Sequence, residues 1–248
     1  TTLGWRMVNP RMPERWTISL GASAELLAEM HNITREAQDA FALRSHRLAA
    51  KAFDEGVMGE VVPVAGVELA RDEAIRTDTS LEALAQLAPA FADGGTVTAG
   101  NSSPLNDGAS MVLIGDRRAG DLLRREPLAR IVSTGAHGVD PDVFGIAPVE
   151  AANLALSRAG IGWGDIAVVE LNEAFASQSL ACLASWPDLD PELVNVRGGA
   201  IAIGHPLGAS GTRILGRLAH ELHARGGGYG LAAICIGVGQ GLAMILEG

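Results

Sequence analysis

Apolar and polar positions along the chain follow two different patterns, one in each half. Up to about Asn106, apolar residues recur at helical spacing between loops rich in charge and proline. Beyond about Pro127, short apolar runs alternate with helical stretches. Short apolar runs are typical of buried strands, and a period of about 3.6 residues is typical of an amphipathic helix. The sequence therefore predicts a mostly helical first half and a layered α/β second half.

Two helices are expected in the first half from their start and stop signals. Thr34 can cap a helix that ends near Gly56. The apolar face expected for this helix consists of Ala37, Phe41, Leu48 and Ala52. Thr79 and Glu82 have the spacing of a capping box ahead of a second helix, which Pro89 would close.

The second half alternates strands and helices in the order expected of an α/β domain. The strand candidates are residues 129–134, 166–171, 193–196, 231–236 and 242–246. The helix candidates are Pro148–Ala159, a helix beginning at Glu173, and a helix that carries Leu215, Leu218 and Leu222. Proline in its first turn and Gly160 directly after it support the first of these helices.

The composition indicates a globular chain and excludes several classes of function. Of the 248 residues, 48% are hydrophobic and 19% are charged, which is typical of a packed domain. A net charge of −10 argues against a general nucleic-acid surface, so an anionic ligand needs a local basic pocket or a helix N-terminus. The two cysteines, Cys182 and Cys235, are too few for a disulfide framework or a cysteine metal cluster, which suits a reducing compartment.

Neither end of the chain predicts a membrane segment. The first residues contain no apolar run of a signal peptide, and the longest apolar stretch, residues 230–246, is interrupted by glycines and Gln240. The chain opens on Thr1 without a methionine, which suggests a fragment or a processed product.

Asn172 stands directly after an apolar strand candidate and before a helix candidate. Most asparagines in such a position are helix N-caps. Ligands of α/β proteins bind at the carboxyl ends of strands, where a side-chain amide can orient a water or a substrate. Both interpretations of Asn172 are open on the residues alone.

His205 lies in a segment, residues 198–211, that contains five glycines. Glycines allow the backbone to approach a ligand closely, and Pro206 favours an extended conformation at His205. A functional and a structural role for this imidazole are about equally supported by these residues. His220 and His223 are three residues apart without a third ligand, so no metal site is predicted there.

Cys235 follows an apolar strand candidate and precedes a glycine-rich turn. Such a cysteine is usually a buried strand thiol. The turn could instead present the sulfur, or backbone N–H groups, to a reacting centre. A dinucleotide-binding interpretation of the glycines fails, because too few residues follow them for a helix and another strand.

These three segments occur together, in this order, in the thiolase family, which the chain resembles. Residues 172–176 resemble its Asn-Glu-Ala-Phe-Ala box, residues 204–206 its Gly-His-Pro box and residues 235–237 its Cys-x-Gly box. The resemblance extends back through residues 106–109, 96–101 and 72–76, and so covers practically the whole chain. Three boxes in series with matched spacing are a specific signal.

The resemblance implies a role for each box. In thiolases a cysteine near the start of the enzyme takes the acyl group as a thioester. His205 would draw the proton from that thiol, and Asn172 would hold a water that stabilises an enolate oxygen together with His205. Cys235 would act as general acid and base on the reacting carbon, and the backbone N–H of Gly237 would contribute to an oxyanion hole.

The resemblance also implies a coenzyme A site in the first half. Arg76, Ala99 and Ser103 match positions that contact the cofactor in relatives, and Phe91 would border its pantetheine arm. Phe175 is also expected to bind coenzyme A. Arg76 would supply the local positive charge that the acidic chain otherwise lacks.

The fold implied by the resemblance is a layered αβα domain with a mixed five-stranded sheet, in which Phe144 lines the acyl pocket. Residues 1–106 would be the loop domain that covers coenzyme A. Residues 107–126 would be a remnant of the amino-terminal domain, with one strand around residues 110–114. Residues 127–248 would be the C-terminal domain, and most of the amino-terminal half of the fold would be missing.

The activity implied is that of an acyl-CoA thiolase, which moves an acyl group between coenzyme A and acetyl-CoA by thiolytic cleavage or the reverse condensation. No permanently bound cofactor and no metal are expected, and relatives are dimers or tetramers. Residues 102–105 and the opening residues 1–17 lean towards 3-ketoacyl-CoA thiolases of fatty-acid degradation, and a cytoplasmic location is expected.

One departure from the family pattern is central. The family's nucleophilic cysteine would precede Thr1, and nothing in the sequence replaces it, since Cys182 lies mid-helix without glycines or a neighbouring base. The chain is therefore expected to be inactive alone. The alternative is a non-catalytic acyl-CoA-binding or assembly module that retains the thiolase fold.

Overall fold

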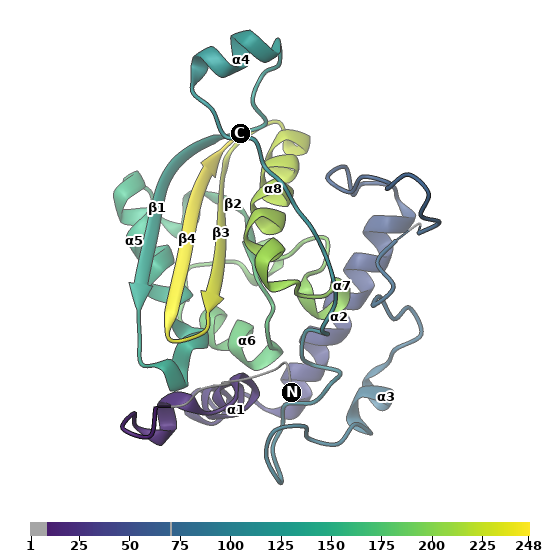
Figure 1. Ribbon diagram of the computed structural model, residues 1–248, viewed down its shortest axis with the longest axis vertical. Coiled ribbons are helices and arrows are strands. Elements are labelled where there is room, and N and C mark those ends of the chain that lie inside the picture. Colours follow the sequence, from purple (N-terminus) through teal and green to yellow (C-terminus); the bar gives the residue numbers. More distant parts are fainter. Residues whose placement is uncertain (1–8, 70) are drawn as a thin grey trace.

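The computed structural model describes residues 9–69 and 71–248, so residues 1–8, part of the opening compared above with 3-ketoacyl-CoA thiolases, lie outside the described residues. Its second half is a sheet between two helical layers, and helices of the first half pack beside one end of that sheet (Figure 1). The chain thus adopts the layered α/β fold that the sequence predicts.

The sheet has four strands in the order β1-β4-β3-β2. They are β1 (Arg130–Gly138), β2 (Ile166–Leu171), β3 (Tyr229–Ile236) and β4 (Gln240–Glu247). β2 and β3 are parallel, while β4 is antiparallel to both β3 and β1. The sheet is therefore mixed, and the carboxyl ends of β2 and β3 meet at one edge.

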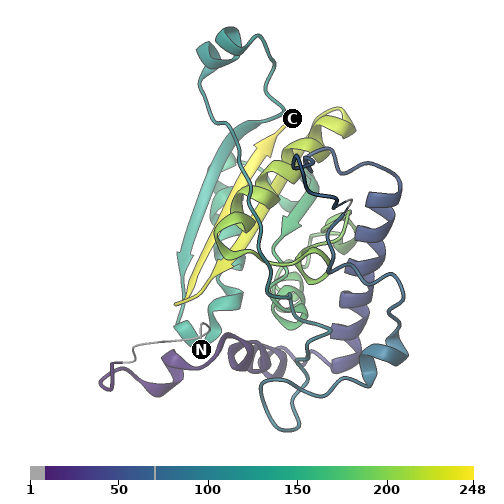
Figure 2. The same ribbon diagram turned by 45° about the vertical axis from the view of Figure 1, so that its right-hand side comes forward.

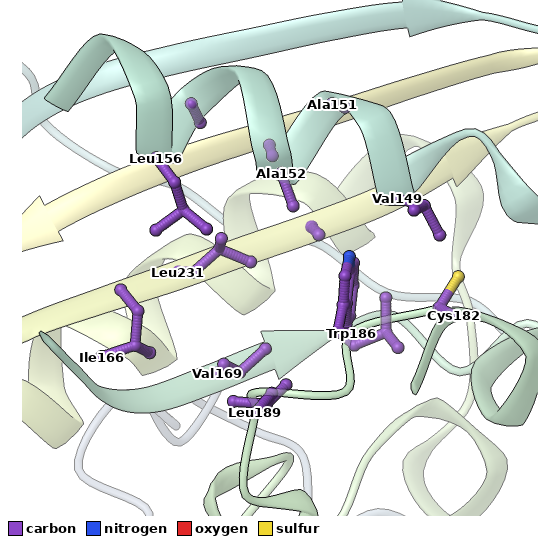
Figure 3. Close-up of a cluster of buried hydrophobic side chains, with 14 of the residues drawn as sticks. Val149, Ala151, Ala152, Leu156, Ile166, Val169, Cys182, Trp186, Leu189 and Leu231 are labelled. Atoms are coloured by element: carbon purple, nitrogen blue, oxygen red, sulfur yellow. The ribbon is translucent and has the colours of Figure 1, made fainter. Parts of the chain in front are cut away.

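The period-2 alternation of strand side chains supplies one core on each face of the sheet. Val169 and Leu171 lie in the cluster on the side of α5 (Pro148–Ala159), which Figure 3 shows together with Trp186. Val168 packs in the cluster on the other side, beneath α8 (Leu207–Arg225). Both faces are buried, which explains why β2 is apolar at every position except Glu170.

The remaining helices lie in the first half or in the connections between the strands of the second half. They are η1 (Glu14–Thr17), α1 (Leu20–Met30), α2 (Arg35–Asp54), α3 (Leu81–Ala85), α4 (Arg117–Leu123), η2 (Pro141–Ile146), η3 (Trp163–Asp165), α6 (Ala176–Ala184), η4 (Pro191–Leu193) and α7 (Ala200–Ile203). α4 projects away from the body of the molecule on two extended arms (Figure 2). In the part of the chain that is described, no helix has both the length and the apolar character needed to cross a membrane.

The prediction of five strands is wrong for the described residues, because the strand expected at residues 193–196 is reduced to one bridge between Val194 and Val169. Asn195 leaves the extended region, with φ 49°. Its side chain takes over the pairing: Oδ1 accepts from Leu171 N and Nδ2 donates to Leu171 O, each at 2.8 Å. A side-chain amide thus replaces the backbone of a fifth strand.

The helix expected to begin at Glu173 begins three residues later, since α6 starts at Ala176 with Phe175 at its N-cap position. The intervening residues bond to a distant segment instead of to a helix. Ser103 N donates to Ala174 O at 3.0 Å, and Ala176 N donates to Asn101 O at 2.9 Å. These bonds hold the predicted cofactor-binding segment against the predicted catalytic box.

The cap expected at Thr79 is also displaced, because the Ser80 hydroxyl accepts from Ala83 N at the start of α3. That helix ends at Ala85, well before Pro89. The strand expected around residues 110–114 is not formed among the described residues. Residues 110–114 instead run as an extended segment along α8, where the Ser110 hydroxyl donates to Ala209 O at 2.6 Å.

α2 begins after Thr34, as predicted, but its buried face differs from the apolar face expected. Ala37 is exposed, whereas Gln38, Asp39, Ser45 and His46 are buried. These polar side chains bond to other segments of the first half and, through Ser45, to Glu173 in the predicted catalytic box. Hydrophobic periodicity cannot identify a face that is buried through hydrogen bonds.

Gly135 tests the close contact between β1 and α5. A Cβ added there would collide with the Ala151 carbonyl oxygen and lie 2.9 Å from Ala155 N. We expect Gly135→Ala to lower the free energy of unfolding by about 3 kcal/mol, because the helix must move off the strand. Gly164→Ala is the control, since nothing lies within 4 Å of its added Cβ. Urea denaturation measures both, and equal stabilities would contradict this packing.

Candidate active site

The three boxes converge at the edge of the sheet where β2 and β3 end. Asn172 directly follows β2, and its backbone N–H donates to Ala233 O of β3 at 2.9 Å. Cys235 lies two residues farther along β3. The predicted ligand-binding position at the carboxyl ends of parallel strands is therefore formed by these two residues.

Asn172 is not a helix N-cap, because α6 begins at Ala176. Its side chain is fully buried, and its Nδ2 lies 3.3 Å from His205 Nε2. No protein group of the described residues bonds its Oδ1. A buried amide oxygen without a protein partner is costly, so this atom is well placed to meet a water or a ligand.

His205 is placed by the glycine-rich loop between α7 and α8. Gly204 has φ 92°, and a Cβ on it would collide with the Asn106 side chain, so the loop requires glycine there. Pro206 occupies the N-cap position of α8. The other ring nitrogen, Nδ1, lies 2.6 Å from the hydroxyl of Ser210 in the first turn of that helix. Sequence reasoning predicted His205 but missed Ser210.

The environment holds the imidazole neutral and the thiol protonated. Burial, followed by the positive charge of Arg213, lowers the pKa of His205 to about 4. Burial raises the pKa of Cys235 to about 12. Low polarity disfavours the charged form of both groups, so at neutral pH His205 can accept a proton and Cys235 carries one to give.

Glu173, expected as the first residue of a helix, is instead a buried carboxylate that joins four segments. Its Oε2 accepts from the Ser45 hydroxyl of α2 at 2.6 Å and from Ile201 N of α7 at 3.1 Å. Its Oε1 accepts from Asn195 Nδ2 at 2.7 Å. The carboxylate thus connects the segments that carry Asn172 and His205. Its position next to Asn172 was the only sequence signal for this role.

Glu170 places a second buried carboxyl close to the site, on the face of β2 that is covered by α8. Burial raises its pKa to about 7, while the nearby charges of Arg217 and Arg213 act in the opposite direction. Arg217 donates to Glu60 Oε1 at 2.7 Å and to Gly198 O at 3.0 Å. This buried charge cluster ties α8 to the loop after α2.

Apolar side chains surround Cys235. Phe144, which the resemblance assigns to the acyl pocket, packs with Ala174 and Cys235 in one buried cluster, and Phe175 borders it. The Leu20 side chain lies 3.8 Å from the Cβ position of Gly237, although it is 46% exposed. Leu20 was missed because an exposed leucine at a helix start carries no signal in the sequence.

The predicted cofactor-binding residues occupy two places. Phe91 stacks edge-on against Phe175, with ring centroids 5.9 Å apart, and Ser103 lies beside the same segment through its bond to Ala174. Ala99 and Arg76 are exposed. The loop of Arg76 is held by His46, whose Nδ1 accepts from Arg76 N at 3.2 Å.

Cys182 lies within α6, as the sequence predicts, and packs in the core beneath α5. Its Sγ donates to Gly145 O at 3.3 Å, and burial raises its pKa. A buried thiol with a raised pKa is a poor nucleophile, because the thiolate is the reactive form.

Comparisons with known proteins match both parts of the chain to one family. The family model "Thiolase, N-terminal domain" matches residues 12–118, and the family model "Thiolase, C-terminal domain" matches residues 125–248. Among curated proteins, the 3-oxoadipyl-CoA/3-oxo-5,6-dehydrosuberyl-CoA thiolase of Escherichia coli (strain K12) is 47% identical over 100% of this chain and 64% of its own length. A 3-ketoacyl-CoA thiolase of Photorhabdus laumondii is 49% identical over 92% of this chain and 62% of its own length.

Solved structures give the same result. The Bacillus anthracis acetyl-CoA acetyltransferase superimposes with a TM-score of 0.88 at 40% identity, over 98% of this chain and 66% of that one. Human mitochondrial 3-ketoacyl-CoA thiolase in complex with CoA gives a TM-score of 0.88 at 43% identity, over 95% and 60%. The chain spans less than two thirds of the length of the curated relatives described above.

Substitution of Glu173 tests its role as the connection between the boxes. We expect Glu173→Ala to lower the free energy of unfolding by about 3 kcal/mol, because three donors, from Ser45, Asn195 and Ile201, lose their acceptor inside the protein. Glu192→Ala is the matched control: its carboxylate is 79% exposed and its ion pair with Arg44 is long, at 3.7 Å, so little change is expected. Chemical denaturation compares them, and a Glu173→Ala variant as stable as the control would refute this role.

Proposed function

Because this chain belongs to the thiolase family, we propose that it carries the acid–base and oxyanion machinery of an acyl-CoA thiolase. The reaction is transfer of an acyl group between coenzyme A and acetyl-CoA, by thiolytic cleavage of a 3-ketoacyl-CoA or by the reverse condensation. The observation that carries this proposal is the pair of Asn172 and His205, 3.3 Å apart at the carboxyl end of β2, beside the strand of Cys235.

Each residue has one task in the cleavage direction. His205, neutral because burial lowers its pKa, takes the proton of the attacking cysteine thiol. The thiolate attacks the 3-keto carbon, and the bond between the second and third carbons breaks, leaving an acyl-enzyme and the enolate of acetyl-CoA. Asn172, through a water, and His205 stabilise the enolate oxygen, and Cys235 gives its proton to the enolate carbon. Coenzyme A then takes the acyl group from the enzyme cysteine.

The geometry of the turn after Cys235 suits an oxyanion hole. Gly237 follows β3 directly, and Val238 beside it has φ 71°, a left-handed conformation that a β-branched residue rarely adopts. Such a turn directs successive backbone N–H groups to one side. We assign the Gly237 N–H to the thioester oxygen, and donors of this kind typically contribute about 3 kcal/mol to barrier lowering.

We further propose that the nucleophile is supplied from outside residues 1–248. Cys182 is buried in the core, and Cys235 has the acid–base task. The curated relatives are longer than this chain, and apolar side chains of the segment after the cofactor-binding loop are exposed, with Met111 93% and Leu113 78% accessible. We assign residues 107–126 to an amino-terminal domain that covers this surface in the full enzyme.

The substrates proposed are acyl-CoA and free coenzyme A, held by a loop domain at residues 1–106 and a C-terminal domain at residues 127–248. Phe91, Phe175 and Ser103 would contact the pantetheine arm, and Arg76 with Ala99 would lie at the nucleotide end. A human relative solved in complex with CoA supports coenzyme A as the ligand. Fatty-acid degradation in the cytoplasm and a homodimer or homotetramer complete the proposal.

The competing function is a non-catalytic acyl-CoA-binding or assembly module. It requires the cofactor-binding residues but gives no reason for a buried thiol beside the Asn172 and His205 pair. The two functions differ in whether the chain moves a proton at the carbon next to a thioester.

Hydrogen exchange at acetyl-CoA tests this difference without requiring the nucleophile. In D2O, we expect Thr1–Gly248 to catalyse deuterium incorporation into the acetyl methyl group. Neutral His205 accepts the methyl proton, Asn172 with its water stabilises the enolate oxygen, and the deuterated thiol of Cys235 gives a deuteron to the carbon and is then reprotonated. Mass spectrometry of the recovered acetyl-CoA measures the exchange. Cys235→Ala should reduce it at least about a hundredfold, the usual contribution of a positioned acid or base.

Cys182→Ala is the control, since it removes the other buried thiol from a position in the core. It should keep the exchange of the unmodified chain. If the unmodified chain binds acetyl-CoA but catalyses no exchange, the binding module is favoured instead.

Acylation gives an independent test of the missing nucleophile. Thr1–Gly248 incubated with acetoacetyl-CoA should keep its intact mass, because neither buried thiol ionises readily. A stable acetyl adduct on Cys235 or Cys182 would overturn the proposal that the nucleophile lies elsewhere.

A further inference from the structure

The two nitrogens of the His205 ring face different kinds of neighbour. Nε2 lies 3.3 Å from Asn172 Nδ2, an amide nitrogen that can only donate. Nδ1 lies 2.6 Å from the Ser210 hydroxyl oxygen, which can donate or accept. Burial lowers the pKa of His205 to about 4, so at neutral pH the ring carries a single proton. That proton is either on Nδ1 or on Nε2.

Ser210 has a second acceptor beside His205 Nδ1 because of its place in α8. It is fully buried, and its hydroxyl also lies 3.2 Å from the Pro206 carbonyl oxygen, one turn back along the chain. The hydroxyl has a single proton, and the carbonyl can only accept. If that proton goes to Pro206 O, the hydroxyl oxygen must accept from Nδ1–H.

With the Asn172 amide oriented so that Nδ2 faces the ring, the amide side favours the proton on Nδ1. With the proton on Nδ1, the lone pair of Nε2 accepts from Asn172 Nδ2, and each of these contacts joins a donor to an acceptor. With the proton on Nε2, that N–H would point at the amide nitrogen, so two donors would face each other at 3.3 Å. Such an opposition inside the protein is unfavourable.

We propose that Ser210 is a positioning residue that holds His205 as the Nδ1-protonated tautomer, with the lone pair of Nε2 directed at the catalytic centre. Ser210 does not touch the reacting atoms and acts only through the imidazole. The consequence for chemistry rests on the proposed thiolase function: the nitrogen that takes the thiol proton is Nε2, and it is ready before substrate binds. The tautomer itself does not depend on turnover.

The test is nitrogen NMR of Thr1–Gly248 labelled with ¹⁵N-histidine at neutral pH. Two-bond ¹H–¹⁵N correlations distinguish a protonated from an unprotonated ring nitrogen, and His205→Gln identifies the signals. We expect a protonated Nδ1 and an unprotonated Nε2 in the unmodified chain. In Ser210→Ala the population ratio should shift towards the Nε2-protonated form by about tenfold, the change that one ordinary hydrogen bond makes in an equilibrium.

Ser185→Ala is the matched control. Its hydroxyl makes the same bond one turn back, to Ala181 O at 2.9 Å, but at the end of α6 and without contact to a histidine. It should leave the His205 signals unchanged. An Nε2-protonated His205 in the unmodified chain would overturn the proposal without any variant. An unchanged ratio in Ser210→Ala would overturn it as well, whereas loss of deuterium exchange alone would concern only the proposed reaction.

Discussion

The buried carboxylate of Glu173 is the interaction on which the arrangement of the site depends. It accepts hydrogen bonds from α2 and, more than a hundred residues later in the sequence, from the loop after η4 and the start of α7. One neighbour in the chain, Asn172, enters the site from β2, and α7 leads directly into His205. A buried carboxylate is costly unless its lone pairs are satisfied, so its partners must all be in place at once. This makes the catalytic geometry a cooperative property of both halves of the molecule.

The same burial produces the two opposite tasks of the candidate catalytic groups. Removing an imidazole and a thiol from water disfavours the cation of the first and the anion of the second. His205 is therefore a neutral acceptor, and Cys235 is a protonated donor, and among residues 9–69 and 71–248 neither has a partner of opposite charge that would ionise it. The apolar cluster of Phe144, Ala174 and Cys235 maintains this environment. Under the proposed function, a thioester carbonyl bound at this end of the sheet would meet donors that are already oriented, which lowers the reorganisation needed during reaction.

Local pattern was sufficient for the elements whose hydrophobic faces decide their structure. β2 and α5 begin and end where the sequence predicts, because a doubly buried parallel strand and an amphipathic helix with proline at its start each have an unambiguous pattern. Predictions failed where a polar side chain replaced regular structure. Asn195 pairs with Leu171 in place of a fifth strand, and the segment around Glu173 turns inward before α6 begins. Such bonds depend on residues that become neighbours only in the folded chain.

The sequence by itself determined the family, the layered fold and the identity of the three boxes that contain Asn172, His205 and Cys235, because these are short contiguous signals. Tertiary structure alone decided how the boxes meet: the distance between Asn172 and His205, the hydroxyl of Ser210 behind the imidazole, the placement of Leu20 against Gly237 and the joining role of Glu173. The physical reason is that hydrogen bonding and desolvation act between atoms that are close in space. Their strength and sign depend on a three-dimensional environment that no local sequence pattern contains.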